Sequence, residues 1–119
     1  MKDVLIMTQA YELLYNIEVI LRQTINEKMR TGYGIAWEHR IKEKHSFANC
    51  YYHELIPYFA KYSPLQKIFT EKERKQLYQL TPIRNKICHM KKLDPNDYTF
   101  LKECHLLVKR TCQYYHEPI

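Results

Sequence analysis

The residue types best suited to chemistry stand together in one short stretch of the chain, at Arg84, Asn85 and His89. Arg84 and His89 are five residues apart, which is about 140° around a helix at roughly 100° per residue, so the long arginine side chain can lean toward the histidine. Asn85 and His89 are four residues apart and share one helical face. If this stretch is helical, the three side chains lie close enough to act on one ligand.

A histidine near an arginine is a suitable pair for phosphoryl chemistry. The imidazole titrates near pH ~6.5 and can move a proton, whereas the guanidinium stays charged and binds phosphate oxygens in a fork. Ile83 and Ile87 are also four residues apart, and we expect them to anchor the opposite face of the helix in a core. The alternative is that Arg84 and His89 belong to a solvated basic face without a chemical role.

The same residues resemble a known signature. Arg84-Asn85-x-x-x-His89 resembles the R-x(4–6)-H motif of the HEPN superfamily, small all-helical domains of prokaryotic toxins, phage-defence proteins and RNA-processing enzymes, in which a polar residue often follows the arginine. The resemblance covers nearly the whole chain through an ordered set of landmarks typical of the abortive-infection-like branch. The landmarks are Glu18, Leu21, Arg22, Tyr33, Gly34, Trp37, Glu54, Leu55, Ile56, Leu77, Leu80, Ile83, Leu93, Asp94 and Asp97.

The resemblance implies an all-α fold, a HEPN-like up-and-down bundle of four to five helices. It also implies a metal-independent endoribonuclease that needs no cofactor and acts as a homodimer, with two Arg/His sets lining one cleft. His89 would then transfer the proton, Arg84 would stabilise the transition state, and Asn85 would orient the histidine ring or hold a phosphate oxygen. Attack by the RNA's own 2′-hydroxyl would leave a 2′,3′-cyclic phosphate. Three lysines are expected to attract the strand: Lys86, Lys91 and Lys92.

Two residues of the first expected helix are assigned a supporting role. Glu18 and Arg22 are an acid and a base four residues apart, a spacing typical of a surface brace along one helix. In the alternative interpretation they face the motif helix and fix Arg84 or His89.

Two other functions are compatible with the sequence. Some HEPN-like domains are non-catalytic, so the chain can be an RNA-binding or protein-interaction module. It can also be the toxin of a nucleotidyltransferase-linked pair, which typically carries a tyrosine two residues after the histidine. Lys91 stands at that position, so modification there by a partner transferase is not expected. An antitoxin or other regulatory protein is a further expected partner if the chain is a toxin or a phage-defence effector.

Composition favours one helical domain with an anionic partner. A chain of 119 residues, 45% hydrophobic and with only two glycines, can bury a core as a single domain spanning 1–119. Its formal charge of +6 favours RNA.

The four cysteines show no C-x-x-C spacing, and no stretch is expected to supply the ~20 apolar residues of a membrane span, so we expect a cytoplasmic protein without a membrane partner. Cys50 and His53 could hold half a metal site, but no second half is visible.

Helix signals divide the chain into segments. Apolar periodicity predicts a long helix from Asp3 to about Arg30, with Gly32 as its left-handed cap. Its predicted apolar stripe is Met7, Ala10, Leu14, Ile17, Leu21, Ile25 and Met29. Shorter helices are expected over 35–44 and over 51–62, the second interrupted by Pro57.

Two start signals follow. Thr70 and Glu73 have the form of a capping box that opens a helix leading into the motif. Asp94 and Pro95 are expected to start a last helix that ends near Tyr115. Its inner stripe is predicted to contain Phe100, Leu101, His105, Val108 and either Leu107 or Cys112.

Overall fold

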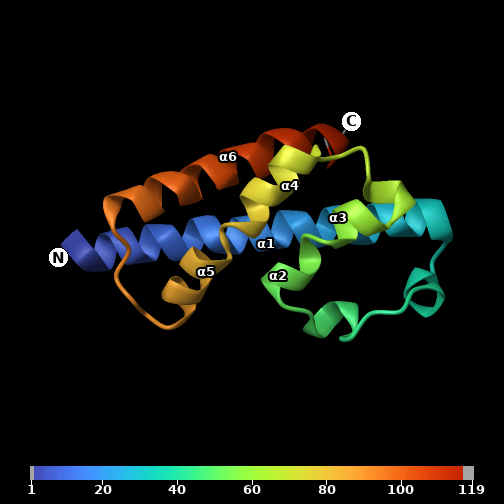
Figure 1. Ribbon diagram of the computed structural model, residues 1–119, viewed down its shortest axis with the longest axis horizontal. Helices are drawn as coiled ribbons and strands as arrows, with labels where there is room; N and C mark the ends of the chain where they lie inside the picture. The colour runs from blue at the N-terminus through green and yellow to red at the C-terminus, as the bar shows by residue number, and fades with distance from the viewer. Residues whose placement is uncertain (1, 117–119) are drawn as a thin grey trace.

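Two long helices form the frame of the molecule. The computed structural model describes residues 2–116, with the side chains of residues 2–112. Helices α1 (Lys2–Tyr33) and α6 (Pro95–His116) pack against each other and run in the same direction, and the chain between them returns through short helices (Figure 1). The return segment contains η1 (Trp37–Arg40), η2 (Phe47–Asn49), α2 (Tyr52–Leu55), α3 (Tyr58–Lys61), η3 (Ser63–Leu65), α4 (Glu71–Tyr78) and α5 (Thr81–Cys88).

The all-α prediction is confirmed, since residues 2–116 contain helices and no strand. The connection differs from a simple up-and-down bundle, because the segment between the parallel α1 and α6 is broken into short pieces. It doubles back to the C-terminal end of α1 at η3 before it runs through α4 and α5 (Figure 1). Pro57, Pro64 and Pro82 lie at these breaks, where proline cannot donate the backbone hydrogen bond that a continuing helix needs.

The predicted stripe of α1 is confirmed as the centre of the core except at Met7, which is only partly buried. One side chain in every three or four is buried against α6 and the return segment: Ala10, Leu14, Ile17, Leu21, Ile25 and Met29. Trp37 is buried as well, and its Nε1 donates to Asn26 Oδ1 at 3.2 Å. The core therefore forms around one face of α1 along most of its length.

The end of α1 corrects the prediction for Gly32. The helix continues through Tyr33, and Gly34 is the residue with a left-handed backbone, at φ +96°. The Gly34 N–H donates to the Arg30 carbonyl at 2.9 Å. Gly32 has a different role, because a Cβ there would lie 2.5 Å from Pro64 Cγ. The first glycine thus permits close packing, and the second ends the helix.

The predicted helix over 35–44 is wrong beyond one short turn. Only Trp37–Arg40 is helical, as a 3-10 turn, and Ile41 is extended. A short segment with few apolar residues gains too little burial to offset the cost of helix nucleation. The interruption at Pro57 is confirmed, since it divides the expected helix over 51–62 into α2 and α3.

Both helix-start signals are confirmed. The Glu73 N–H donates to Thr70 Oγ1 at 3.1 Å, and the Thr70 N–H donates to Glu73 Oε1 at 2.9 Å. At the start of α6 the Asp97 N–H donates to Asp94 Oδ1 at 2.8 Å.

The predicted inner stripe of α6 needs one correction. Its buried residues are Leu101, Cys104, Leu107, Val108 and Cys112. Phe100 and His105 are only half-buried, and burial lowers the pKa of the His105 imidazole. The buried face of α6 therefore includes Cys104, which was not predicted, and only the edges of Phe100 and His105.

The expectation about membrane spans also needs correction. By length and hydropathy alone, α1 is the one helix in the described part of the chain that could cross a membrane. Its buried stripe offers another reason for that composition, since the central helix of a globular core passes the same test.

Candidate functional site

The predicted motif lies on helix α5, which contains Arg84 and Asn85 and ends at His89. Pro82 occupies its first turn, where the missing N–H costs no helical hydrogen bond. Ile83 and Ile87 are buried, which confirms that they anchor the opposite face. The packing of α5 against α1 then sets which neighbours Arg84 meets.

Arg84 lies against α1 through Glu18. Arg84 Nε is 3.6 Å from Glu18 Oε1, and each side chain is 26% exposed. This distance makes an ion pair but is too long for a hydrogen bond, and the buried Nε has no hydrogen-bond partner among the described residues. The other end of the guanidinium is 3.5 Å from Asn85 Oδ1, at the limit of a hydrogen bond. Arg84 is thus held by charge while much of its donor capacity stays unused.

Asn85 and His89 are exposed beside Arg84. His89 is the C-terminal cap of α5 rather than an interior helical residue, with φ −97° and ψ 13°, a sparsely populated backbone region. No hydrogen bond joins Arg84 to the His89 ring within the described part of the chain. The structure therefore places the three residues on or at the end of one helix, without a hydrogen bond between arginine and histidine among the described residues.

The residue after His89 carries backbone strain. Met90 has φ 58°, the left-handed region that favours glycine, and its side chain is 89% exposed. The Met90 N–H donates to the Ile87 carbonyl at 3.1 Å, and the Lys91 N–H donates to the Lys86 carbonyl at 2.7 Å. These two bonds form a Schellman cap in which methionine stands where glycine is usual. The cap fixes the position of His89.

Two of the three predicted RNA-binding lysines are already paired. Lys86 Nζ lies 2.8 Å from Asp97 Oδ2, and this hydrogen bond raises the pKa of Lys86. Lys92 Nζ lies 3.4 Å from Asp3 Oδ2, a contact between exposed groups. Lys91 is exposed, and no described residue forms an ion pair with it. Lys91 is thus the most available cation of the three.

The predicted pairing of Glu18 with Arg22 is not formed among the described residues. Arg22 instead donates from Nη1 to the Phe47 carbonyl at 2.9 Å and from Nη2 to the Cys50 carbonyl at 2.6 Å. Arg22 therefore fixes the loop around η2, whereas Glu18, one turn earlier on α1, meets Arg84. Of the two supporting residues, only Glu18 contacts the motif.

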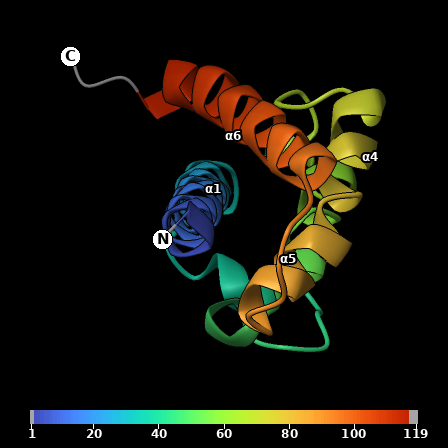
Figure 2. The same ribbon diagram turned by 90° about the vertical axis from the view of Figure 1, so that its left-hand side faces the viewer.

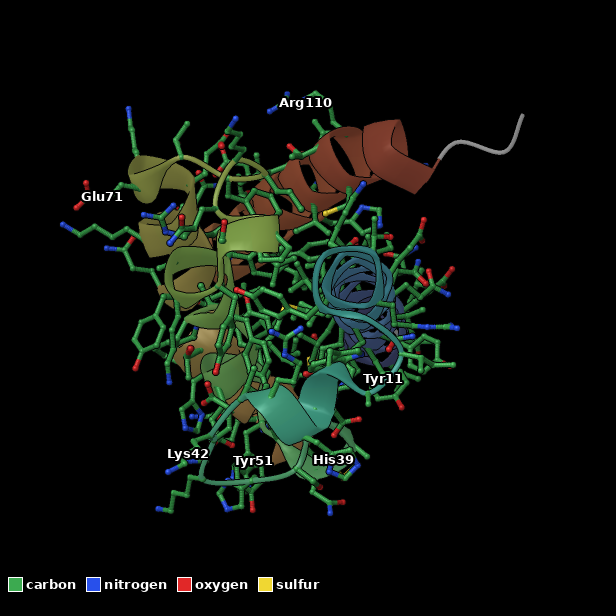
Figure 3. All side chains as sticks on the ribbon, turned by 90° about the vertical axis from the view of Figure 1, so that its right-hand side faces the viewer. Tyr11, His39, Lys42, Tyr51, Glu71 and Arg110 are labelled. Carbon is green, nitrogen blue, oxygen red and sulfur yellow. The ribbon has the colours of Figure 1, made fainter. Side chains whose placement is uncertain are left out.

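An apolar groove beside the motif was not predicted. It has a volume of about 490 Å³ and lies between the first turns of α1 and the end of α5. Figure 2 shows these two elements at the end of the molecule that faces the viewer, and Tyr11 projects from α1 at the surface in Figure 3. The apolar side chains that line the groove are Val4, Met7, Tyr11, Ile87 and Met90. The sequence of the first turns of α1 could have indicated this groove, because it contains apolar residues such as Val4 and Tyr11 that lie outside the buried stripe.

The Cys50 and His53 pair does not form a metal site with other described residues. Cys50 precedes α2 and is buried beside Arg22, and burial raises the pKa of its thiol. No group of three or more potential ligands from histidine, cysteine, aspartate and glutamate occurs among the described residues.

Comparison with known proteins gives no match: no family model, curated protein or solved structure is significantly similar to this chain. The resemblance to the HEPN superfamily thus stays a prediction from the motif and its landmarks.

Proposed function

We propose that this chain is a metal-independent endoribonuclease of the HEPN type, with Arg84, Asn85 and His89 at its site. The observation that carries the proposal is the state of Arg84, whose guanidinium is held at 3.6 Å from Glu18 while its buried Nε has no hydrogen-bond partner among the described residues. The enclosed Nε faces Glu18, so a phosphate would accept hydrogen bonds from the Nη groups, whose one partner among the described residues is Asn85 Oδ1 at 3.5 Å.

The proposed reaction needs two proton-transfer groups. One His89 removes the proton from the 2′-hydroxyl, whose oxygen attacks the adjacent phosphorus. The bond from phosphorus to the 5′-oxygen breaks, and a second histidine gives that oxygen its proton. Arg84 stabilises the charge on the phosphorane, and Asn85 holds a phosphate oxygen. The product is a 2′,3′-cyclic phosphate.

A homodimer would supply the second histidine. Each protomer presents one His89, and the apolar groove lies next to it with Val4 61% exposed, Tyr11 61% exposed and Met90 89% exposed. Association through this face would cover these side chains and bring two α5 ends together. Tyr11→Glu places a charge in the groove, so sedimentation should show a shift from dimer to monomer together with loss of cleavage. Tyr78→Glu, at an exposed tyrosine away from the groove, is the control.

The direct test is cleavage of total RNA in EDTA. The wild-type protein should cut RNA, leave a 2′,3′-cyclic phosphate, and fail on a strand with deoxyribose at the scissile position. His89→Ala should lower the rate by about a hundredfold or more. His53→Ala, at an exposed histidine on α2, is the matched control and should cleave normally. Wild-type protein that binds RNA but leaves it intact between pH 6 and 8 would contradict the proposal.

The second candidate is a non-catalytic module that binds RNA or a protein. The apolar groove and the internal pairing of Lys86 and Lys92 favour a protein partner within this candidate. A module of this kind would yield no RNA products at any concentration.

As a nuclease, the chain would fit a toxin or phage-defence effector of the abortive-infection kind in the cytoplasm. An antitoxin or regulatory protein would then hold it inactive, and it could do so by occupying the groove of one protomer and preventing the dimer.

A further inference from the structure

A small cavity lies away from the motif, beside the loop between η1 and η2. It has a volume of about 210 Å³, below the roughly 300 to 1,000 Å³ typical of sites for drug-sized ligands. Its walls come from three places: Glu38 in η1, Glu43 in the loop, and Phe47 with Tyr58 at the starts of η2 and α3. His39, also in the wall, marks this side of the molecule in Figure 3.

Tyr58 has an unused hydroxyl in this wall. Its side chain is 2% exposed, and no described residue forms a hydrogen bond with its Oη. A buried hydroxyl without a partner is costly, so it points to a ligand. Burial raises the pKa of Tyr58, and the nearby carboxylates of Glu43 and Glu38 raise it further. The hydroxyl therefore stays protonated and can donate a hydrogen bond, although its oxygen is enclosed and the wall must move for a ligand to reach it.

The carboxylates supply the complementary acceptors. Glu38 is exposed and has no hydrogen-bond or ion-pair partner among the described residues. Glu43 accepts from Lys61 Nζ at 3.0 Å and from the Tyr62 hydroxyl, both at Oε2, which leaves its Oε1 available. Phe47 adds an aromatic wall, held edge-on against Trp37 at 5.3 Å between ring centroids. A phenol, two carboxylates and an aromatic ring thus line one space of about 210 Å³.

We propose that this cavity binds an unpaired guanine base, and that the base belongs to the RNA substrate, a point that rests on the proposed function. Guanine presents two N–H donors beside a carbonyl acceptor on its Watson–Crick edge. A carboxylate accepts from the donors while a phenol donates to the carbonyl, and unpaired bases are commonly read in this way against aromatic side chains. Adenine offers the carboxylate no comparable pair of donors. A cation is less suitable, since the described residues contain no group of three metal ligands.

The cavity and the motif are anchored on neighbouring turns of α1. Arg22 holds the Phe47 carbonyl, and Glu18 pairs with Arg84. These two α1 residues are about 6 Å apart along the helix axis. A strand that fills both sites would place the base of one nucleotide in the cavity and the phosphate of another near the motif.

The test is an NMR titration of the full chain with guanosine and with adenosine, up to millimolar nucleoside. Guanosine should bind about tenfold or more tightly than adenosine, with shifts at the cavity. Tyr58→Phe and Glu38→Gln should each weaken guanosine binding by about tenfold, whereas Glu12→Gln, at an exposed carboxylate on α1, should not. Tyr58→Phe should keep or raise the thermal midpoint of the wild type, because the lost hydroxyl is buried and has no partner.

The outcomes separate this proposal from the nuclease. No saturable binding, equal binding of both nucleosides, or guanosine binding unchanged by Tyr58→Phe and Glu38→Gln would overturn it and leave a hydrated cavity only. His89→Ala should bind guanosine as the wild type does. Guanosine binding without RNA cleavage would contradict the nuclease alone, and cleavage without guanosine binding would contradict the guanine site alone.

Discussion

Replacing Arg84 by lysine should separate the role of charge from the role of the fork. In the structure Arg84 Nε lies 3.6 Å from Glu18 Oε1, with both side chains 26% exposed. Partly exposed pairs of this kind contribute at most about 1 kcal/mol. For 119 residues, 1 kcal/mol corresponds to about 4 °C in thermal midpoint. Arg84→Ala should therefore lower the midpoint by about 4 °C or less, and Arg84→Lys, which keeps the charge, by less still.

The effect on cleavage should be far larger and nearly the same for both variants. A lysine cannot reproduce the forked contact to a phosphorane, and loss of such a contact typically lowers the rate by about 10²- to 10³-fold. Initial rates on a labelled RNA, together with circular dichroism melts, give both quantities. Arg110→Lys, at an exposed arginine on α6, is the control and should change neither. Full activity of Arg84→Lys, or unfolding of Arg84→Ala, would refute the reasoning.

Three further predictions concern the surroundings of the motif. Met90→Gly should raise the free energy of unfolding by about 0.5–1 kcal/mol in chemical denaturation, because it relieves a left-handed backbone, whereas Met90→Ala keeps the strain and should bring no gain. A maleimide should label exposed Cys88 and block cleavage, whereas the Cys88→Ser variant should be active and insensitive to the reagent. The buried thiols should not react, because burial raises the pKa of Cys112 to about 11 and of Cys104 to about 12. Label found on the buried thiols by mass spectrometry would contradict this. Lys91→Ala should reduce the salt dependence of RNA binding by about 0.7 in log–log slope, and Lys86→Ala by less, because Asp97 already neutralises Lys86; equal slopes in filter binding would contradict it.

Features decided by a few neighbouring residues could be predicted from the sequence. The Thr70 and Glu73 box and the Asp94 start each depend on contacts within four residues, so their side-chain types already specify the backbone. The buried stripe of α1 was visible for a similar reason, since helical periodicity alone assigns its face. Ile83 and Ile87 followed from the same rule.

Features decided by competition between distant partners could not be predicted. Arg22 can reach either Glu18 or the loop around η2, and the sequence does not say that the Phe47 and Cys50 carbonyls are its partners. Gly32 and Gly34 are two residues apart, and the approach of Pro64 to Gly32 comes from a segment far along the chain. The cavity at Tyr58 likewise depends on where an irregular loop lies.

The strain at Met90 links the motif to the proposed dimer. Glycine would adopt φ 58° without cost, yet the chain keeps a methionine whose side chain is 89% exposed and so gains little within one protomer. The cost is understandable if Met90 makes its contacts with a second copy across the groove, where an adaptable apolar side chain packs well. Since Met90 directly follows His89, the same contact would bring the two histidines together. Met90→Gly should then stabilise the protomer while weakening the dimer and slowing cleavage, and a single substitution that moves stability and activity in opposite directions is not expected of a solvated basic face.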